Sequence, residues 1–435
     1  MRATVIAGLI VATWATSLSA NAVETSIRPV VRPDAAVISG AQLAKATSVR
    51  GDQSMDADEG QPVNQRFQNW ISAFKRRAEE QGIEPQVLEQ AFRAVHYDAD
   101  VIRRDRNQSE FTKTIWEYLD TAVSPTRIAN GKSALQKHGA TLNEIEAKYG
   151  VDKQVVVAIW GLESAYGGFR GSNNVIESLS TLAFDSRRGA FFEGQLIAAL
   201  RILQSGDTNA SSMTGSWAGA MGHTQFMPTS YLDYAVDHTG DGKRNIWGDD
   251  PSDALASTAA YLAHFGWTKG QPWGVEVALP DGFDFTQASR KITRSPADWA
   301  GMGIRNMAGN PVPDHGKASI LLPAGGQGAA FMIFDNFAVI EQYNTADAYV
   351  IGVGHLGDRI AGGPAIQATW PRQDRALTFK ERKEMQQRLT QAGFDTQKID
   401  GKIGPLTIAA VRAYQVANGL LPDGYASLRI LNALR

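Results

Sequence analysis

The stretch Ile159-Trp160-Gly161-Leu162-Glu163-Ser164-Ala165-Tyr166-Gly167 decides the fold expected for this chain of 435 residues. On a helix, the residues three, four and seven positions before Glu163 share its face, and all three are apolar. Glu163 therefore extends an apolar stripe, and Tyr166-Gly167-Gly168 is expected to end the helix. A carboxyl on such a face is partly desolvated, which raises its pKa and suits it to protonate a glycosidic oxygen. The alternative is an exposed carboxylate at a helix end.

A second informative stretch runs from Gly215 to Tyr231 and reads Gly-Ser-Trp-Ala-Gly-Ala-Met-Gly-His-Thr-Gln-Phe-Met-Pro-Thr-Ser-Tyr. Its small residues would let a polymer approach the backbone closely. Ser216 and Gln225 can supply neutral hydrogen bonds to sugar hydroxyl and acetamido groups. We interpret this mixture as part of a binding groove.

Helical periodicity continues on both sides of these stretches. Helices are expected over residues 66–78, 85–95, 152–164, 191–204, 253–265 and 336–358, with a break near Asn344. Three strand candidates, Val275–Leu279, Ala318–Leu322 and Ala329–Phe334, predict a small sheet inserted in a helical body. The expected fold class is therefore mainly α, in the broader α+β class.

Composition and the N-terminus limit the function. A net charge of −2 gives no global field for nucleic acid, and the absence of Cys excludes disulfides, thiolate nucleophiles and a lipid-anchored Cys. A basic start, an apolar run over residues 5–18 and Ser19-Ala20-Asn21-Ala22 predict a signal peptide over residues 1–22. Residues 23–64 are expected to be a disordered tether. These features predict an exported, soluble, periplasmic protein without a membrane anchor.

Three motifs occur in order: Gly-Leu-Glu-Ser-x-Tyr-Gly from Gly161, Ala-Gly-Ala-Met-Gly-x-Thr-Gln-Phe-Met-Pro-x-Ser-Tyr from Ala218, and Asn-Phe-x-Val-Ile-x-x-Tyr-Asn from Asn336. Together they resemble the lytic murein transglycosylase B family of the lysozyme-like superfamily, over residues 65–365. The resemblance implies a lysozyme-like helical catalytic domain with a small inserted β region. It also implies non-hydrolytic cleavage of the β-1,4 bond from N-acetylmuramic acid to N-acetylglucosamine in peptidoglycan.

The implied mechanism needs one carboxyl group and no cofactor. Glu163 would protonate the leaving oxygen and then accept the proton of the muramyl C6 hydroxyl, which attacks C1 and leaves a 1,6-anhydromuramyl end. Ordinary glycosidases use two carboxyl groups instead. Asp185 is the nearest second acid, but its neighbours Arg187 and Arg188 favour an ion pair.

The resemblance further implies a set of substrate-binding residues. Ser216 and Gln225 would hold acetamido and hydroxyl groups, and Arg187 would face the saccharide or its peptide carboxylates if it is not in an ion pair. The other implied groove residues are Tyr166, Phe226, Tyr261, Asn336 and Tyr343. Tyr261 could equally belong to the core and Asn336 could be a helix N-cap, while His223 is expected to be structural.

The run Asp237-His238-Thr239-Gly240-Asp241-Gly242-Lys243 resembles the start of an EF-hand loop. Asp237, Thr239 and Asp241 would offer side-chain oxygens, and Lys243 its backbone carbonyl. Gly248 stands where an EF-hand has its bidentate Glu, and the family resemblance offers Asp253 as the later acidic ligand. The alternatives are a structural Ca²⁺ ion and a metal-free turn in which Asp253 caps the next helix.

Residues 366–376 are expected to be a linker, and residues 377–435 resemble the peptidoglycan-binding domain type 1. The resemblance rests on Ile399-Asp-Gly-x-Ile-Gly-Pro-x-Thr407, Val411-x-x-Tyr-Gln415 and Leu421-Pro-Asp-Gly424. Three short helices are expected there, over residues 380–392, 404–418 and 427–434. Such a module would hold the catalytic domain on glycan strands.

Three other functions are alternatives to this interpretation. A hydrolytic muramidase would use the same acid with water as the attacking group, and a non-catalytic wall-binding protein would need no Glu163. A zinc amidase is disfavoured because the seven His residues form no His-Glu-x-x-His motif. Glycan strands are the expected partner, together with cell-wall synthesis or remodelling complexes.

Overall fold

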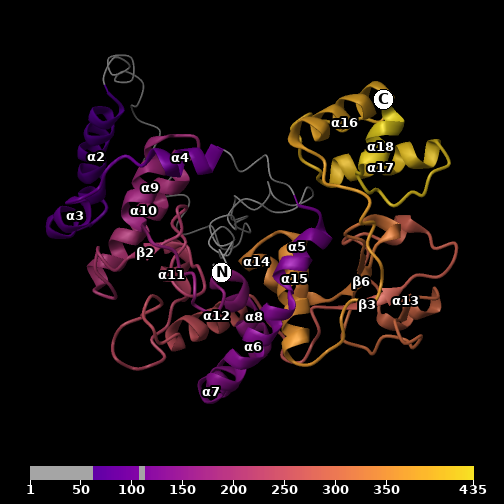
Figure 1. Cartoon of the computed structure of the whole chain (residues 1–435), viewed down its shortest axis with the longest axis horizontal. Helices are drawn as coiled ribbons and strands as arrows, with labels where there is room; N and C mark the ends of the chain where they lie inside the picture. Colours follow the sequence, from indigo (N-terminus) through magenta and orange to yellow (C-terminus); the bar gives the residue numbers. More distant parts are fainter. Residues whose placement is uncertain (1–61, 107–112) are drawn as a thin grey trace, which may run out of the picture.

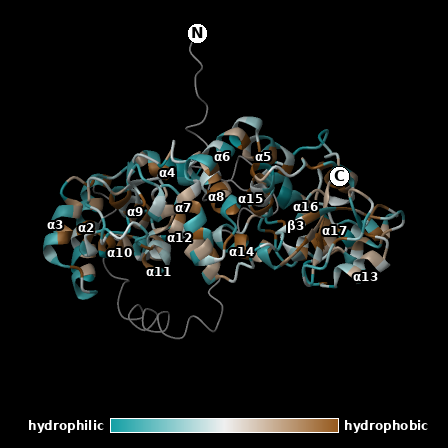
Figure 2. Ribbon diagram, turned by 90° about the horizontal axis from the view of Figure 1, so that it is seen from below, coloured by the Kyte–Doolittle hydropathy of each residue, from teal (hydrophilic) through white to brown (hydrophobic). Residues whose placement is uncertain are grey.

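The computed structural model describes residues 62–106 and 113–435, which Figures 1 and 2 show from two directions. The expected signal peptide and the expected tether up to residue 61 lie outside the described residues. The first helix within the described residues begins at Val63, so the last two residues assigned to the tether are helical. The chain is mostly helical with small sheets, which confirms the predicted fold class.

The N-terminal helices pack against two helices of the body (Figure 1). These elements are α2 (Val63–Glu80), α3 (Pro85–Phe92), α4 (Ala99–Arg106), α9 (Val175–Phe184) and α10 (Gly189–Ser205). The apolar residues of α2 fall on one face, so Phe67, Ile71 and Phe74 are buried. The Phe67 ring meets that of Phe184 in α9, with 5.4 Å between centroids.

The body is a set of helices around α8 (Lys153–Ser164), which packs on α6, α7, α12 and α15. The surrounding helices are α5 (Ile115–Ala122), α6 (Pro125–Lys137), α7 (Gly139–Tyr149), α11 (Pro228–Tyr234), α12 (Ser252–His264), α14 (Asp335–Tyr343) and α15 (Asp347–Ile360). Every residue from Val155 to Ser164 is buried, because neighbouring elements surround α8 on all sides. Figure 2 shows α8 near the middle of the molecule. The predicted break near Asn344 separates α14 from α15.

A four-stranded antiparallel sheet has the order β4-β3-β6-β5 and its own core around Trp299 and Met332. Its elements are β3 (Gly274–Ala278), η4 (Phe285–Gln287), α13 (Pro296–Gly301), β4 (Arg305–Asn306), β5 (Ser319–Leu321), η5 (Gly325–Gln327) and β6 (Ala330–Ile333). All three predicted strands are present. The sequence did not predict β4, because two residues are too few to show alternation. A second, two-stranded sheet pairs β1 (Asn173–Asn174) with β2 (Thr214–Gly215).

The C-terminal module has its own core, which includes Leu389, Val411 and Leu431. Its helices are α16 (Phe379–Gln391), α17 (Pro405–Ala417) and α18 (Leu428–Leu434), close to the predicted bounds. The module touches the inserted sheet region, where the backbone N–H of Gly326 donates to Asp423 Oδ2 at 3.0 Å.

Within residues 62–106 and 113–435, none of the helices has the length and apolar character needed to cross a bilayer.

Candidate active site

Glu163 lies one residue before the end of α8, and only 5% of its surface is exposed. Burial raises the pKa of its carboxyl to about 8, while a hydrogen bond from Tyr349 acts in the opposite direction. The carboxyl group is therefore mostly protonated at neutral pH, because the charged form loses its hydration inside the protein. This is the state that a general acid requires.

Tyr349 in α15 is a site residue that sequence reasoning missed. Its hydroxyl donates to Glu163 Oε1 at 2.6 Å, across 186 residues of sequence. No local pattern could predict such a contact. The available signal was that Tyr343 and Tyr349 flank the predicted helix break. The two rings lie nearly parallel, 6.4 Å apart, and the Tyr343 hydroxyl donates to the Thr224 carbonyl at 2.6 Å.

The end of α8 is shaped by left-handed backbone at Ala165 (φ 49°) and Tyr166 (φ 61°). The turn folds the Tyr166 ring back onto Gly161, where an added Cβ would lie 2.5 Å from the ring. The Tyr166 hydroxyl donates to the Arg127 carbonyl at 2.7 Å, and the Arg127 guanidinium donates to the Gly161 carbonyl. Tyr166 thus holds the helix end, and its predicted stacking on a sugar stays a prediction.

The segment from Gly215 to Met227 contacts the end of α8, since Ser164 Oγ donates to the His223 carbonyl at 2.5 Å, and within this segment Ser216 and Gln225 are largely buried. Ser216 Oγ accepts the backbone N–H of Ala220 at 3.1 Å. Gln225 has a φ of 55°, and its Nε2 donates to the carbonyls of Arg170 (3.1 Å) and Gly222 (2.8 Å). Its Oε1 is buried and has no hydrogen-bond partner within the described part of the chain. That oxygen can accept an N–H or O–H group of a ligand.

An aromatic cluster continues from these residues. The Phe226 ring lies 5.9 Å from the rings of both Tyr261 and Tyr343, which are 5.1 Å from each other. The Tyr261 hydroxyl donates to the Gln342 carbonyl at 2.5 Å. Tyr343 also interacts electrostatically with Glu163. Burial is the main cause that raises the pKa of the Tyr343 phenol, and the negative charge of the Glu163 carboxylate raises it further. The structure therefore brings Phe226, Tyr261 and Tyr343 together, and Tyr343 is the member of this cluster that interacts with Glu163.

Asn336 lies elsewhere and is completely buried. Its Nδ2 donates to the carbonyls of Thr268 (2.8 Å) and Gln271 (2.7 Å), and its Oδ1 accepts the N–H of Thr268 at 2.8 Å. Both amide hydrogens are thus used within the protein. Asn336 is also not the N-cap of α14, which is Phe334.

Arg187 lies between α9 and α10, and its Nε donates to Asp105 Oδ2 at 2.7 Å. Arg188 also pairs with Asp105. Asp185 forms an ion pair as expected, but its partner is Arg106 at 2.6 Å rather than either neighbouring arginine. The structure therefore gives Arg187 a buried acidic partner and does not bring it into the group around Glu163.

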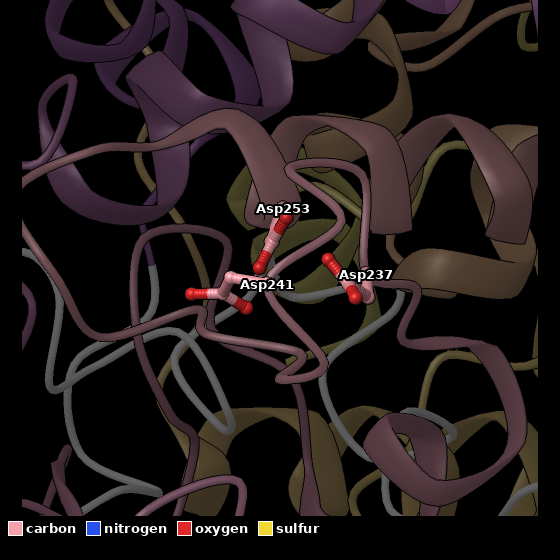
Figure 3. A group of neighbouring side chains, drawn as sticks. All are labelled: Asp237, Asp241 and Asp253. Carbon is pink, nitrogen blue, oxygen red and sulfur yellow. The ribbon is translucent and has the colours of Figure 1, made fainter.

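The acidic loop fits a hard divalent cation. One carboxylate oxygen from each of Asp237, Asp241 and Asp253 lies within 4.8 Å of the other two (Figure 3). Asp253 is buried in the first turn of α12, where Pro251 is the N-cap. Its carboxylate accepts backbone N–H groups of the loop, including that of Asn245 at 2.8 Å. Converging carboxylates are the ligands that Ca²⁺ prefers.

The remaining expected ligands lie in the same loop. Thr239 Oγ1 donates to Asp237 Oδ1 at 3.3 Å, and the Lys243 N–H donates to Asp241 Oδ1 at 2.9 Å. Both contacts order the loop around the carboxylates.

Residues 66–358 match the family described as transglycosylase SLT domain, and residues 380–434 match the one described as "Putative peptidoglycan binding domain". Membrane-bound lytic murein transglycosylase B of Escherichia coli K12 is 34% identical over 251 residues, which span 56% of this chain and 66% of that protein.

Several solved structures are similar to this chain. SltB3 from Pseudomonas aeruginosa, in complex with NAG-anhNAM-pentapeptide, is 48% identical with a TM-score of 0.83, covering 85% of this chain and 99% of that one. Escherichia coli Slt35 in complex with calcium is 30% identical with a TM-score of 0.58, covering 69% and 93%. The chain therefore belongs to the SLT-domain family of lytic transglycosylases, enzymes that cleave peptidoglycan.

Proposed function

We propose that this chain cleaves the β-1,4 bond between N-acetylmuramic acid and N-acetylglucosamine without consuming water, using Glu163 as its acid and base. The supporting observation is a buried carboxyl with a pKa of about 8, held by Tyr349. Among the described residues, no second carboxylate contributes to this pKa. A two-carboxylate glycosidase would place another acid nearby.

In the first step, protonated Glu163 gives its proton to the glycosidic oxygen and the bond from C1 to that oxygen breaks. The substrate's own acetamido oxygen relieves the positive charge at C1. Glu163 is then a carboxylate, and the Tyr349 hydroxyl stabilises its charge at 2.6 Å. In the second step, the muramyl C6 hydroxyl attacks C1 and gives its proton to Glu163. A C1–O6 bond forms and the acid is restored.

Ser216 and the unpaired Gln225 Oε1 are proposed to bind the saccharide, with Phe226, Tyr261 and Tyr343 as the groove wall. The relative SltB3 was crystallised with an anhydromuramyl ligand, which supports this product class. We propose structural roles for Arg187, Tyr166 and Asn336 rather than direct contacts with the saccharide, because their polar groups are hydrogen-bonded to other residues of the protein.

Product analysis tests the proposal. Purified sacculi are digested with the wild type and with Glu163→Gln, and the fragments are analysed by mass spectrometry. We expect anhydromuramyl ends from the wild type and a loss of at least about 10³-fold in rate for the variant. Reducing ends would identify a hydrolytic muramidase, and full activity of Glu163→Gln would exclude Glu163 as the acid.

We also propose a structural Ca²⁺ in the acidic loop, held by Asp237, Asp241 and Asp253 with Thr239 and the Lys243 carbonyl. Calcium should raise the thermal midpoint of the wild type, because binding to the folded state alone stabilises it by about 2.7 kcal/mol at a hundred times the Kd. Asp241→Asn should abolish this rise, and the control Asp281→Asn, an exposed acid outside the loop, should retain it. An equal rise in all three proteins would place the ion elsewhere. No cofactor is proposed for the chemistry.

The C-terminal module is proposed to bind peptidoglycan, and the chain to act in the periplasm after export. Cell-wall synthesis complexes stay the expected protein partners. Fractionation of cells that express the full chain tests the location, and a cytoplasmic protein with an intact N-terminus would contradict it.

A further inference from the structure

His223 is the centre of a buried contact between three separate segments. Its ring Nδ1 accepts the indole N–H of Trp160 at 3.1 Å, and its Nε2 lies 2.7 Å from the carbonyl of Gly248. An indole nitrogen can only donate, so Nδ1 carries no hydrogen and the Nε2–H donates to Gly248. The position of both neighbours therefore fixes the tautomer and the orientation of this neutral ring.

The first of these segments is helix α8, which carries Glu163. Trp160 lies three residues before Glu163 on α8, on the same face. The hydroxyl of Ser164, the residue after Glu163, donates to the His223 carbonyl at 2.5 Å. A Cβ added at Gly167, just beyond α8, would lie 2.6 Å from the imidazole ring, so this turn packs directly against His223.

His223 also contacts the acidic loop of residues 237–253. Gly248 donates its backbone N–H to Asn245 Oδ1 at 3.0 Å, and Asn245 donates its own to Asp253 Oδ2 at 2.8 Å. The backbone N–H of His223 donates to the carbonyl of Ile246 at 3.0 Å in the same loop. Four consecutive hydrogen bonds thus join a candidate cation ligand to Trp160.

We propose that His223 is a positioning residue that couples cation binding in the loop 237–253 to the placement of Glu163. An ion that binds Asp253 would restrict the movement of the loop around Gly248. Because His223 contacts both this loop and the end of α8, the position of the helix end would become better defined as well. The consequence for catalysis rests on the proposed function, but the coupling itself does not. Because coupling is reciprocal, breaking the contact must also weaken cation binding.

The direct measurement uses the full chain with ¹⁵N-labelled tryptophan and follows the indole N–H signal of Trp160 by NMR, assigned with Trp160→Phe. Adding Ca²⁺ to the chelator-treated wild type should shift this signal. His223→Phe should remove the shift and weaken the Ca²⁺ Kd, measured by calorimetry, about five- to tenfold. The matched control is His138→Phe, because the His138 ring also contacts Trp160 (5.4 Å between ring centroids) but no hydrogen bond joins the two side chains among the described residues. This control should keep the wild-type shift and Kd.

Kinetics supply a second readout on the same proteins. His223→Phe should lower kcat about tenfold with little change in KM, since misplacing a catalytic group affects turnover rather than binding. His223→Gln keeps one acceptor and one donor and should recover part of kcat and of the calcium effect. This partial recovery also separates lost coupling from failure to fold.

The proposed coupling would be wrong if Ca²⁺ did not shift the Trp160 signal of the wild type, or if the wild type did not bind Ca²⁺. It would also be wrong if His223→Phe and His138→Phe had equal effects. Failure of the proposed function would look different. Sacculi would then yield no anhydromuramyl ends while the calcium-dependent shift persisted.

Discussion

Glu163 depends on two opposing influences that act on one carboxyl group. Burial disfavours its charged form, and the Tyr349 hydroxyl, at 2.6 Å, favours it. The balance leaves a pKa of about 8, high enough to keep a proton at neutral pH. In the proposed mechanism, the same hydroxyl stabilises the Glu163 carboxylate that forms between the two steps. A single residue can then donate and accept one proton within a catalytic cycle.

This balance predicts the pH dependence of cleavage. Activity on a soluble glycan fragment should fall as pH rises through about 8, because Glu163 loses the proton that the leaving oxygen needs. Tyr349→Phe removes a hydrogen bond that favours the carboxylate, so the alkaline limb should move up by about one pH unit. Its kcat should fall about tenfold, since the intermediate carboxylate loses support. A profile of kcat/KM against pH for both proteins checks this, and an unmoved or lowered limb for Tyr349→Phe would contradict the assignment.

The same pKa predicts a stability cost. The carboxyl has an ordinary value of 4.5 when exposed and about 8 in the fold, so the folded state binds more protons between these values. Stability from this group is therefore present below about pH 4.5 and is lost as pH rises towards 8. Glu163→Gln stays neutral and should be more stable than the wild type at pH 7.5, by about 1 kcal/mol or more, with a smaller gain at pH 4.5. Urea unfolding at both pH values measures the difference, and a less stable variant at pH 7.5 would refute it.

At the scale of the elements, the sequence predicted what repeats locally and missed what depends on distant neighbours. The helix expected over residues 152–164 is observed as α8, because its apolar residues and its turn at Tyr166 lie within one segment. The bond between Tyr349 and Glu163 was not predictable, since it joins helices 186 residues apart. The groove residues inside the motifs are predictions that rest on family resemblance. Asn336 shows the limit of that approach, because its amide hydrogens are used within the protein.

At the end of α8, we predict that Gly161→Ala lowers stability, whereas helix propensity alone would predict a gain. Gly to Ala inside a helix normally stabilises by about 1 kcal/mol. At Gly161 the added Cβ would lie 2.5 Å from the Tyr166 ring, so Gly161→Ala should destabilise by roughly 1 to 3 kcal/mol and lower kcat. Gly194→Ala in α10 is the matched control, because nothing lies within 4 Å of its added Cβ, and it should stabilise. Thermal unfolding of both variants decides, and equal stabilisation would mean that the ring does not hold the helix end.

At the scale of the whole molecule, two modules with separate cores are held in contact. The linker in residues 366–376 is tied to the body, since Arg372 pairs with Asp120 of α5 through two contacts of 2.7 and 2.9 Å. The sequence predicted both modules, because each carries its own motifs, and it predicted a linker between them from its composition. Their docking could not be predicted, since it depends on a contact between Gly326 and Asp423, 97 residues apart. A docked module would present a bound glycan strand at a fixed distance from Glu163, whereas a loose one would only raise its local concentration.

The contact between the C-terminal module and the inserted sheet region can be tested by placing a large side chain at Gly326. A Cβ added there would lie 2.5 Å from the Phe285 ring and 2.8 Å from Leu421 of the C-terminal module, so Gly326→Phe should separate the modules and increase the radius of gyration in small-angle X-ray scattering. Cleavage of intact sacculi should fall about tenfold, because the two sites no longer act on one strand in a fixed geometry. Cleavage of a short soluble fragment should change less than about twofold, since only Glu163 and its groove are needed. Gly301→Phe, in the same inserted region with open space around its Cβ, is the control and should match the wild type in all three measurements. If Gly326→Phe expands the molecule and still degrades sacculi at the wild-type rate, fixed docking does not contribute to cleavage, and the module acts only as a tether.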